Sequence, residues 1–142
     1  MNVKSELIDL RNVAEMLPPL LAKIGQTKLF GLDCETTDIE TRHAGLNAYN
    51  TATKLVFDHR RTTMTGFSIY LDGDDTAYYF NLNHADVENR LPAAIVAAVL
   101  DAVPDDAIGV AHNLPFELVM FKQCCGRDLK NFVCTLQMAV SH

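Results

Sequence analysis

The chain has 142 residues, of which 49% are hydrophobic and 21% are charged, and its formal net charge is -6. This length suits a single domain with one core, and the composition excludes disordered, collagen-like and disulfide-framework proteins. The negative charge excludes a globally basic nucleic-acid binder, but it is compatible with an enzyme that contacts phosphates through carboxylate-bound metal ions.

The first part of the chain predicts a helical segment, a buried strand and a long polar connection. Residues 9–24 carry apolar side chains near helical spacing, and we expect Pro18 and Pro19 to divide them into a turn and a short helix. Residues 28–34 form an apolar run typical of a central strand, which we expect to end where carboxylates and threonines begin. The polar segment 37–63 has the length of a functional or mobile loop.

The second part predicts a hairpin and then alternating helices and strands. Residues 64–71 and 76–82 are β-rich and flank a turn rich in Asp and Gly, which predicts an antiparallel hairpin. Helix, strand, helix and a strand entering a helix are then expected over residues 91–103, 107–111, 115–125 and 132–140. The predicted fold is α/β, a mixed sheet of an antiparallel hairpin and parallel strands flanked by helices, with functional groups beyond the carboxyl ends of the parallel strands.

The cysteine and hydropathy patterns bear on the compartment. The four cysteines form no CxxC pair and have no His at zinc-site spacing, so we expect reduced, packed thiols. No stretch approaches the roughly 18 consecutive apolar residues of a membrane span, and the N-terminus has no signal-peptide core. We therefore expect a cytoplasmic protein without a membrane partner.

A carboxylate pair follows the first predicted strand, in the run Asp33-Cys34-Glu35-Thr36-Thr37. In extended backbone, residues two apart point to the same face, so Asp33 and Glu35 would face one way and Cys34 the other. Two carboxylates on one face repel each other, which suggests a hard cation such as Mg²⁺ or Mn²⁺ between them. The alternative is a strand end that turns into solvent, where acidic residues are common.

A third carboxylate lies where a later strand becomes a helix, within residues 112–117. Pro115 suits the first helical turn, and Glu117 falls in the same turn, where the helix dipole favours negative charge. Taken alone, Glu117 fits an ordinary helix-start acid. If the two strands are neighbours, however, it can converge with Asp33 and Glu35 on one metal cluster.

These motifs resemble those of the DEDD (DnaQ-like) 3′-to-5′ exonucleases of the ribonuclease H-like superfamily, most closely the proofreading domain of family A DNA polymerases. The sequence FGLDCETTDIE (30–40) resembles the first exonuclease motif, and GVAHNLPFELVMF (109–121) resembles the second. The hairpin at 65–86 and the segment FVCTLQMA (132–139) resemble the connecting parts. The resemblance therefore spans nearly the whole chain after residue 27.

The chain departs from the family pattern in three places. Glu117 stands where the second motif usually has Asp, and Cys134 stands where the family often has Asp. The third motif, a Tyr or His followed by Asp, is missing, because residues 129–142 contain no carboxylate. We therefore expect residues 1–142 to be a single exonuclease-like domain, truncated at its C-terminus relative to the family.

The resemblance implies two-metal-ion hydrolysis of phosphodiester bonds at the 3′ end of single-stranded DNA, with RNA as the other substrate. Asp33 would bridge two Mg²⁺ or Mn²⁺ ions, Glu35 would bind one ion and orient the attacking water, and Glu117 would hold the other ion. The resemblance also implies that Thr36, Thr37 and Asn113 bind the substrate. The basic residues Arg60 and Arg61 are candidates for phosphate contacts, against the alternative of a solvated charged loop.

The missing third motif makes activity the weakest part of this prediction. We expect weak or absent turnover unless a polymerase domain or a second chain completes the site. The alternative is a non-catalytic module on the same fold that binds single-stranded nucleic acid or protein. Two further alternatives are a ribonuclease acting on short RNA and an α/β domain whose acids are ordinary strand and helix ends.

Overall fold

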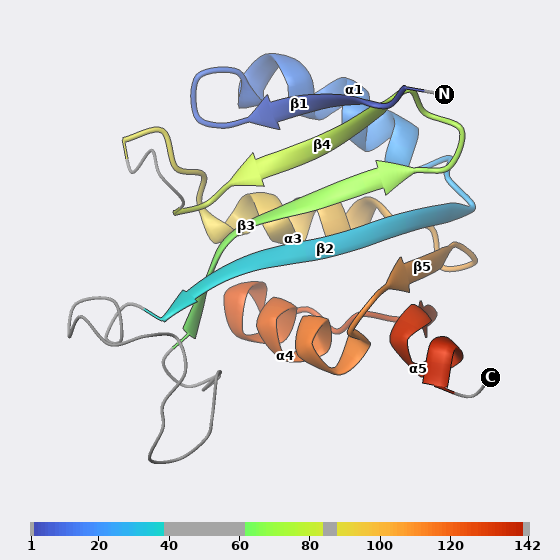
Figure 1. The fold of residues 1–142 in the computed structure, drawn as a ribbon. Helices are drawn as coiled ribbons and strands as arrows, with labels where there is room; N and C mark the ends of the chain where they lie inside the picture. Colours follow the sequence, from blue (N-terminus) through green and yellow to red (C-terminus); the bar gives the residue numbers. More distant parts are fainter. Residues whose placement is uncertain (1, 39–61, 84–87, 141–142) are drawn as a thin grey trace.

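The computed structural model describes residues 2–38, 62–83 and 88–140 (Figure 1). Within these residues the chain forms one six-stranded sheet in the order β1-β4-β3-β2-β5-β6. The strands are β1 (Lys4–Ile8), β2 (Leu29–Asp38), β3 (Thr62–Leu71), β4 (Thr76–Asn81), β5 (Ile108–Ala111) and β6 (Phe132–Cys134). The helices are α1 (Val13–Ile24), α3 (Ala93–Ala102), α4 (Leu114–Cys125) and α5 (Thr135–Val140).

The sheet is mixed, as the sequence predicts. Strands β2, β3 and β4 are antiparallel neighbours, whereas β1 runs parallel to β4, β5 to β2, and β6 to β5. The hairpin prediction is confirmed, because β3 and β4 flank the Asp- and Gly-rich turn. The later helix and strand predictions are also confirmed, and Gly126 ends α4 in the left-handed conformation that favours glycine.

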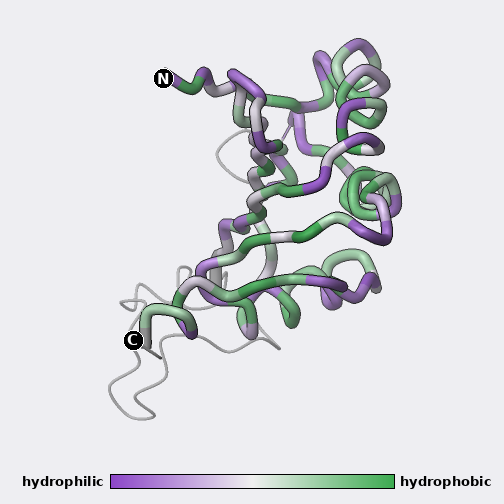
Figure 2. Tube along the Cα trace, turned by 90° about the vertical axis from the view of Figure 1, so that its right-hand side faces the viewer, coloured by the Kyte–Doolittle hydropathy of each residue, from purple (hydrophilic) through white to green (hydrophobic). Residues whose placement is uncertain are grey.

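The core lies between the sheet and its helices. Phe67 of β3 and Phe80 of β4 are fully buried and their rings stack at 4.5 Å, while Phe121 of α4 meets Phe67 edge-on at 5.8 Å. In the edge-on view, α1 and α3 lie to one side of the strands and α5 lies to the other (Figure 2). Burial of these aromatic rings therefore fixes which face of the sheet the main helices cover.

Pro18 and Pro19 do not divide the first helical segment, so that prediction is wrong. Helix α1 runs unbroken from Val13 to Ile24 with both prolines inside it. Each proline removes a helical hydrogen bond, but both are exposed, whereas Leu20 and Ile24 are buried in the core. The burial of this apolar side outweighs the lost hydrogen bonds.

Two strands also differ from the prediction. The sequence pattern does not predict β1, because four of its five residues are exposed at the edge of the sheet. The predicted strand end at Cys34 is wrong as well, since β2 continues to Asp38 while paired with β3. The carboxylate motif therefore lies inside a strand. None of the described helices is long and apolar enough to cross a membrane.

Candidate nuclease site

The candidate site forms where β2 extends beyond the end of its pairing with β5. Pairing of β2 with β5 ends at Gly31 opposite Val110, whereas pairing with β3 continues to Asp38 opposite Thr62. The chain leaves β5 at Ala111 and soon enters α4, which packs against β2 and β3. Figure 1 shows α4 alongside the part of β2 that extends past β5. The first turn of α4 is thereby brought beside the carboxylate motif.

Two junctions fix the position of α4. The Gln123 side chain donates a hydrogen bond to the Thr62 carbonyl at 2.9 Å, which joins the far end of α4 to the start of β3. At the other end, the thiol of Cys134 donates to the His112 carbonyl at 3.3 Å and accepts from the Leu114 amide at 3.4 Å. Cys134, which stands where the resembled family often has Asp, therefore holds the start of α4.

Glu117 has its carboxylate inside the protein. The side chain is only 2% exposed, and among the described residues its Oε2 atom has no hydrogen-bond partner. A carboxylate whose only role is to interact with the helix dipole would remain in solvent, because burial of a charge without a partner is costly. Burial with an unpartnered oxygen is what a carboxylate that binds a cation would show.

Glu117 meets two residues of β2. Burial raises its pKa to about 7, hydrogen bonds from the thiol and backbone of Cys34 lower it, and the adjacent Asp33 carboxylate raises it. Burial also raises the pKa of the Cys34 thiol, and the charge of Glu117 adds to that increase. Asp33 therefore lies near Glu117, and a cation bound there would stabilise the ionised form of Glu117.

Glu35 lies on the same strand as Asp33, two residues further along. Asp33 and Glu35 are exposed and Cys34 is buried, in agreement with the predicted alternation along the strand. The charge of Glu35 acts on Cys34 and Tyr79, whereas the pKa of Glu117 responds to Asp33 and Cys34. Among the described residues, no group of three or more His, Cys, Asp or Glu side chains is arranged to hold a metal ion. The structure thus brings Asp33 near Glu117, and the metal-binding role of the three predicted ligands stays a prediction.

The other predicted site residues are placed less tightly. Thr36 is half-buried just beyond an irregularity in the β2–β3 register, and Asn113 is exposed at the start of α4. Thr37 belongs to β2, but its side chain is not described. Arg60 and Arg61 lie outside the described residues.

Tyr79 also lies near the carboxylate motif, although no sequence motif predicts this. The run of aromatic residues in β4 predicts strand core, which holds for Tyr78 and Phe80 because both are buried. Tyr79 is half-buried, and a Cβ atom at Gly66 would overlap its hydroxyl group. Burial, and then the charge of Glu35, raise the pKa of Tyr79. The signal available in the sequence is a glycine inside a strand, which often marks a close approach by another group.

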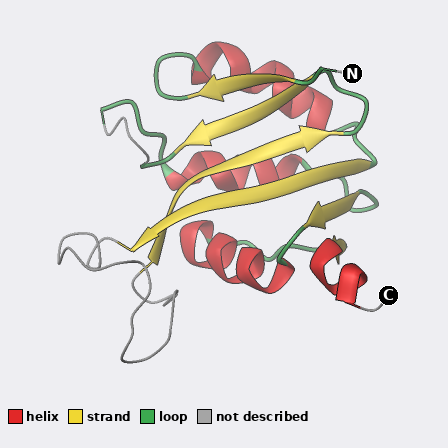
Figure 3. Ribbon diagram, viewed as in Figure 1, coloured by secondary structure: helices red, strands yellow, loops and turns green. Residues whose placement is uncertain are grey.

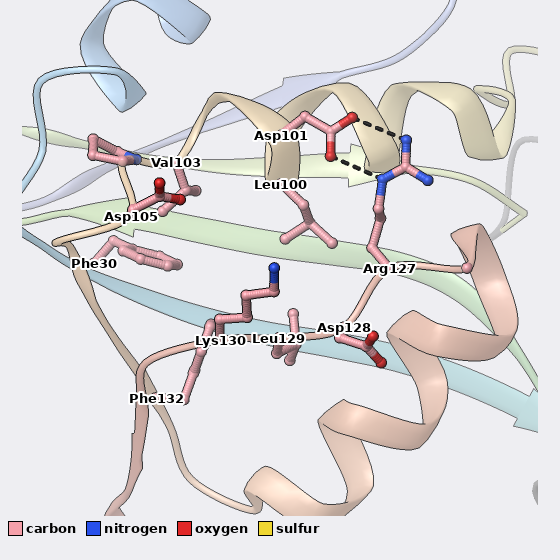
Figure 4. A pocket seen from close by; sticks show the side chains of 12 residues that line it. Phe30, Leu100, Asp101, Val103, Asp105, Arg127, Asp128, Leu129, Lys130 and Phe132 are labelled. Carbon is pink, nitrogen blue, oxygen red and sulfur yellow. Dashed lines mark hydrogen bonds and ion pairs between the residues drawn. The ribbon is translucent and has the colours of Figure 1, made fainter.

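A cavity lies elsewhere on the molecule. It measures about 720 Å³ and is lined by the C-terminal ends of α3 and α4, the segment before β6, and Phe30 near the start of β2 (Figure 4). On one side, Arg127 forms two hydrogen bonds to the Asp101 carboxylate at 2.8 and 3.0 Å. Of the predicted site residues whose side chains the structure describes, none lines this cavity.

The chain resembles several solved structures, and exonuclease domains are among them. No family model and no curated protein matches the sequence. The EXO domain of Aedes aegypti Nibbler matches with a TM-score of 0.63 at 10% identity, covering 96% of this chain and 55% of that chain. RNase D of Trypanosoma brucei in complex with RNA U12 matches with a TM-score of 0.65 at 10% identity, covering 94% and 38%.

A bacterial nuclease structure matches over the same region. Brucella melitensis NrnC with bound Mg²⁺ has a TM-score of 0.51 at 17% identity, covering 95% of this chain and 50% of that chain. This chain has the fold of an exonuclease domain. It corresponds to about 38–55% of the length of these three structures. At these identities the likeness establishes the fold alone.

Proposed function

We propose that the chain is a 3′-to-5′ exonuclease domain that hydrolyses phosphodiester bonds at the 3′ end of a single-stranded nucleic acid. The observation that carries this proposal is the Asp33–Glu117 pair, in which Glu117 is 2% exposed with an unpartnered oxygen. An exonuclease fold supports it independently. The burial of Glu117 has no comparable explanation if the acids are ordinary strand and helix ends.

The chemistry of the donor set fits Mg²⁺ or Mn²⁺. Carboxylate oxygens are the ligands that hard divalent cations prefer, and a cation would stabilise the ionised form of Glu117, whose pKa is raised to about 7. Asp33 and Glu117 would hold the first ion, and Glu35 would reach the second by side-chain rotation from its exposed position. NrnC has been solved with Mg²⁺, and the exonuclease domain of EXD2 after soaking in Mn and GMP.

The residues of this chain divide the remaining work. Bound divalent cations supply an activated water and stabilise the leaving 3′ oxygen. Glu35 orients the water, and Asn113 and the threonines after Glu35 contact the terminal nucleotide. Arg60 and Arg61 contact the phosphates that precede it. Glu117 must lose its proton before it can bind a cation, so activity should rise from pH 6 to pH 8.

The substrate strand is proposed as DNA or RNA. The motifs resemble a DNA-proofreading domain, whereas RNase D has been solved with RNA U12 and NrnC with pGG. Residues 1–142 would act as one domain in the cytoplasm, with a polymerase domain or a second chain completing the site. Separate digestion of a single-stranded DNA and a single-stranded RNA oligonucleotide of the same sequence distinguishes a proofreading nuclease from a ribonuclease.

The test is Mn²⁺-dependent shortening of a 5′-labelled single-stranded oligonucleotide. Asp33→Asn and Glu117→Gln should each lower the rate by about a hundredfold or more, because each removes charge from the metal site. Asp105→Asn is the matched control, since Asp105 is an exposed carboxylate that lines the other cavity. Equal shortening by the wild type and the two site variants would overturn the proposal, as would cleavage of a substrate whose 3′ end is blocked.

A second candidate function is a non-catalytic module that binds single-stranded nucleic acid. It is favoured by the absence of a preformed three-ligand cluster among the described residues. This alternative predicts strand binding that survives EDTA and is unchanged in Asp33→Asn. Fluorescence anisotropy with a labelled oligonucleotide, with and without EDTA, separates the two functions.

A further inference from the structure

Tyr79 reaches across the sheet toward the carboxylate motif. Tyr79 lies on β4, two positions before Asn81, and Asn81 pairs with Gly66 of β3. An ideal Cβ atom at Gly66 would overlap the Tyr79 hydroxyl, so the hydroxyl occupies the space that a side chain at position 66 would fill. Gly66 thus provides the space into which the phenol extends.

Glu35 is the neighbour of Gly66 on the other side. The two residues are directly paired in the antiparallel β2–β3 ladder. Cβ atoms of directly paired residues lie about 4.5–5.5 Å apart. The hydroxyl of Tyr79, which stands where the Cβ of residue 66 would be, is therefore within reach of the rotatable Glu35 carboxylate. Tyr79 takes the place of the cross-strand partner that Gly66 cannot supply.

We propose that Tyr79 is a positioning residue of the candidate site, whose hydroxyl over Gly66 donates a hydrogen bond to Glu35 and limits the orientations of its carboxylate. A phenol, with an ordinary pKa of about 10, is a donor at neutral pH, and an ionised carboxylate is a strong acceptor. Glu35 is otherwise an exposed side chain, whose orientation burial does not restrict. The role of Tyr79 in metal binding rests on the proposed function.

The first arm of the test needs neither metal nor activity. Thermal unfolding of wild type, Tyr79→Phe, Glu35→Gln and the double variant in EDTA forms a double-mutant cycle. We expect Tyr79→Phe to lower Tm by about 2–4 °C with Glu35 present and to have little effect in Glu35→Gln. Equal Tm changes in the two backgrounds would mean that the residues do not interact and would overturn the proposal.

Tyr78→Phe is the matched control. Tyr78 is the adjacent tyrosine, but its hydroxyl contacts Lys23 at 3.3 Å and Asp74 at 3.5 Å, away from Glu35. Its Tm effect should be the same with Glu35 and with Gln at that position. Coupling of Tyr78 to Glu35 as strong as that of Tyr79 would overturn the assignment.

The second arm measures Mn²⁺ affinity by electron paramagnetic resonance. Tyr79→Phe should weaken binding by about threefold to tenfold, and this loss should vanish in Glu35→Gln. In turnover, the same variant should lower kcat while leaving KM nearly unchanged, since Tyr79 acts through Glu35. Unchanged Mn²⁺ affinity in Tyr79→Phe would overturn the positioning role. Failure of the wild type to bind Mn²⁺, with the Tm coupling intact, would instead overturn the exonuclease proposal and support the Tyr79–Glu35 contact.

Discussion

In both halves of β2, a residue of the strand pairs with a glycine that an aromatic side chain covers, but the two aromatic residues differ in their role. In the first half, Phe30 pairs with Gly109 of β5, and the ring of Phe132 covers that glycine at 2.5 Å from an ideal Cβ position. In the second half, Glu35 pairs with Gly66, which the Tyr79 hydroxyl covers. The first aromatic residue contributes only to packing, whereas the second brings a polar group to a carboxylate.

The difference follows from the neighbours of the strand. At Phe30 and Gly31, β2 is paired on both sides. After Gly31 its pairing with β5 ends and α4 takes that side, so Glu117 can approach Asp33. The part of a strand that extends beyond a neighbouring strand can carry charged side chains, because it is no longer buried between two strands.

The largest expected effect in this comparison is that of Gly66→Ala. The added Cβ would lie 2.7 Å from the Phe80 carbonyl oxygen, which is backbone, and would also displace the Tyr79 hydroxyl. We expect a loss of about 3 kcal/mol in the free energy of unfolding, at the upper end of overpacking effects. Urea denaturation measures this loss. A value below about 1 kcal/mol would show that the strands beside the second half of β2 shift readily to accommodate the added Cβ.

The second effect is a pH dependence that comes from Glu117. Its pKa rises from 4.5 in the unfolded chain to about 7 in the folded chain, mainly through burial. Its contribution to stability is therefore complete below pH 4.5 and is lost as pH rises through 7. At about 1.4 kcal/mol per pKa unit, this rise corresponds to a loss of slightly more than about 3 kcal/mol in metal-free buffer.

Glu117→Gln provides the control for this pH dependence. The amide does not titrate, so the stability of wild type minus that of the variant should fall between pH 4.5 and pH 8. Added Mn²⁺ should reduce the fall, because a cation stabilises the ionised carboxylate. Parallel stability curves for the two proteins would contradict the burial of an ionisable Glu117.

Gly109→Ala should have a smaller effect than Gly66→Ala. The three atoms nearest to its Cβ would be ring atoms of Phe132, at 2.5–2.7 Å. Phe132 is half-buried in the edge strand β6, so its ring can move aside. We expect a loss of about 1–2 kcal/mol, again by urea denaturation. A loss larger than that of Gly66→Ala would reverse the order proposed for the two halves.

The smallest effect is expected at the ion pair beside the first half of β2. The Lys28 ammonium lies 2.7 Å from the Asp106 carboxylate, but both side chains are about two-thirds or more exposed. Solvent-exposed ion pairs contribute little, so Lys28→Met should change stability by less than about 0.5 kcal/mol. A loss above about 1 kcal/mol would show that this end of the sheet depends on charge.

The sequence by itself determined the features that depend on near neighbours in the chain. Alternation along an extended strand placed Asp33 and Glu35 on one side of Cys34, and Gly126 marked the end of α4. Hydropathy and turn residues likewise predicted the hairpin. These signals are local, because they arise from backbone geometry and from residues close in the chain.

Tertiary structure decided which distant groups meet. The length of β2 depended on its pairing with β3, and the helical state of Pro18 and Pro19 depended on burial of the opposite side of α1. Glu117 reached Asp33 because β5 ends before β2 does, and Tyr79 approached Glu35 because Gly66 lies between them. Such contacts depend on strand order and register, which no single segment of the sequence encodes.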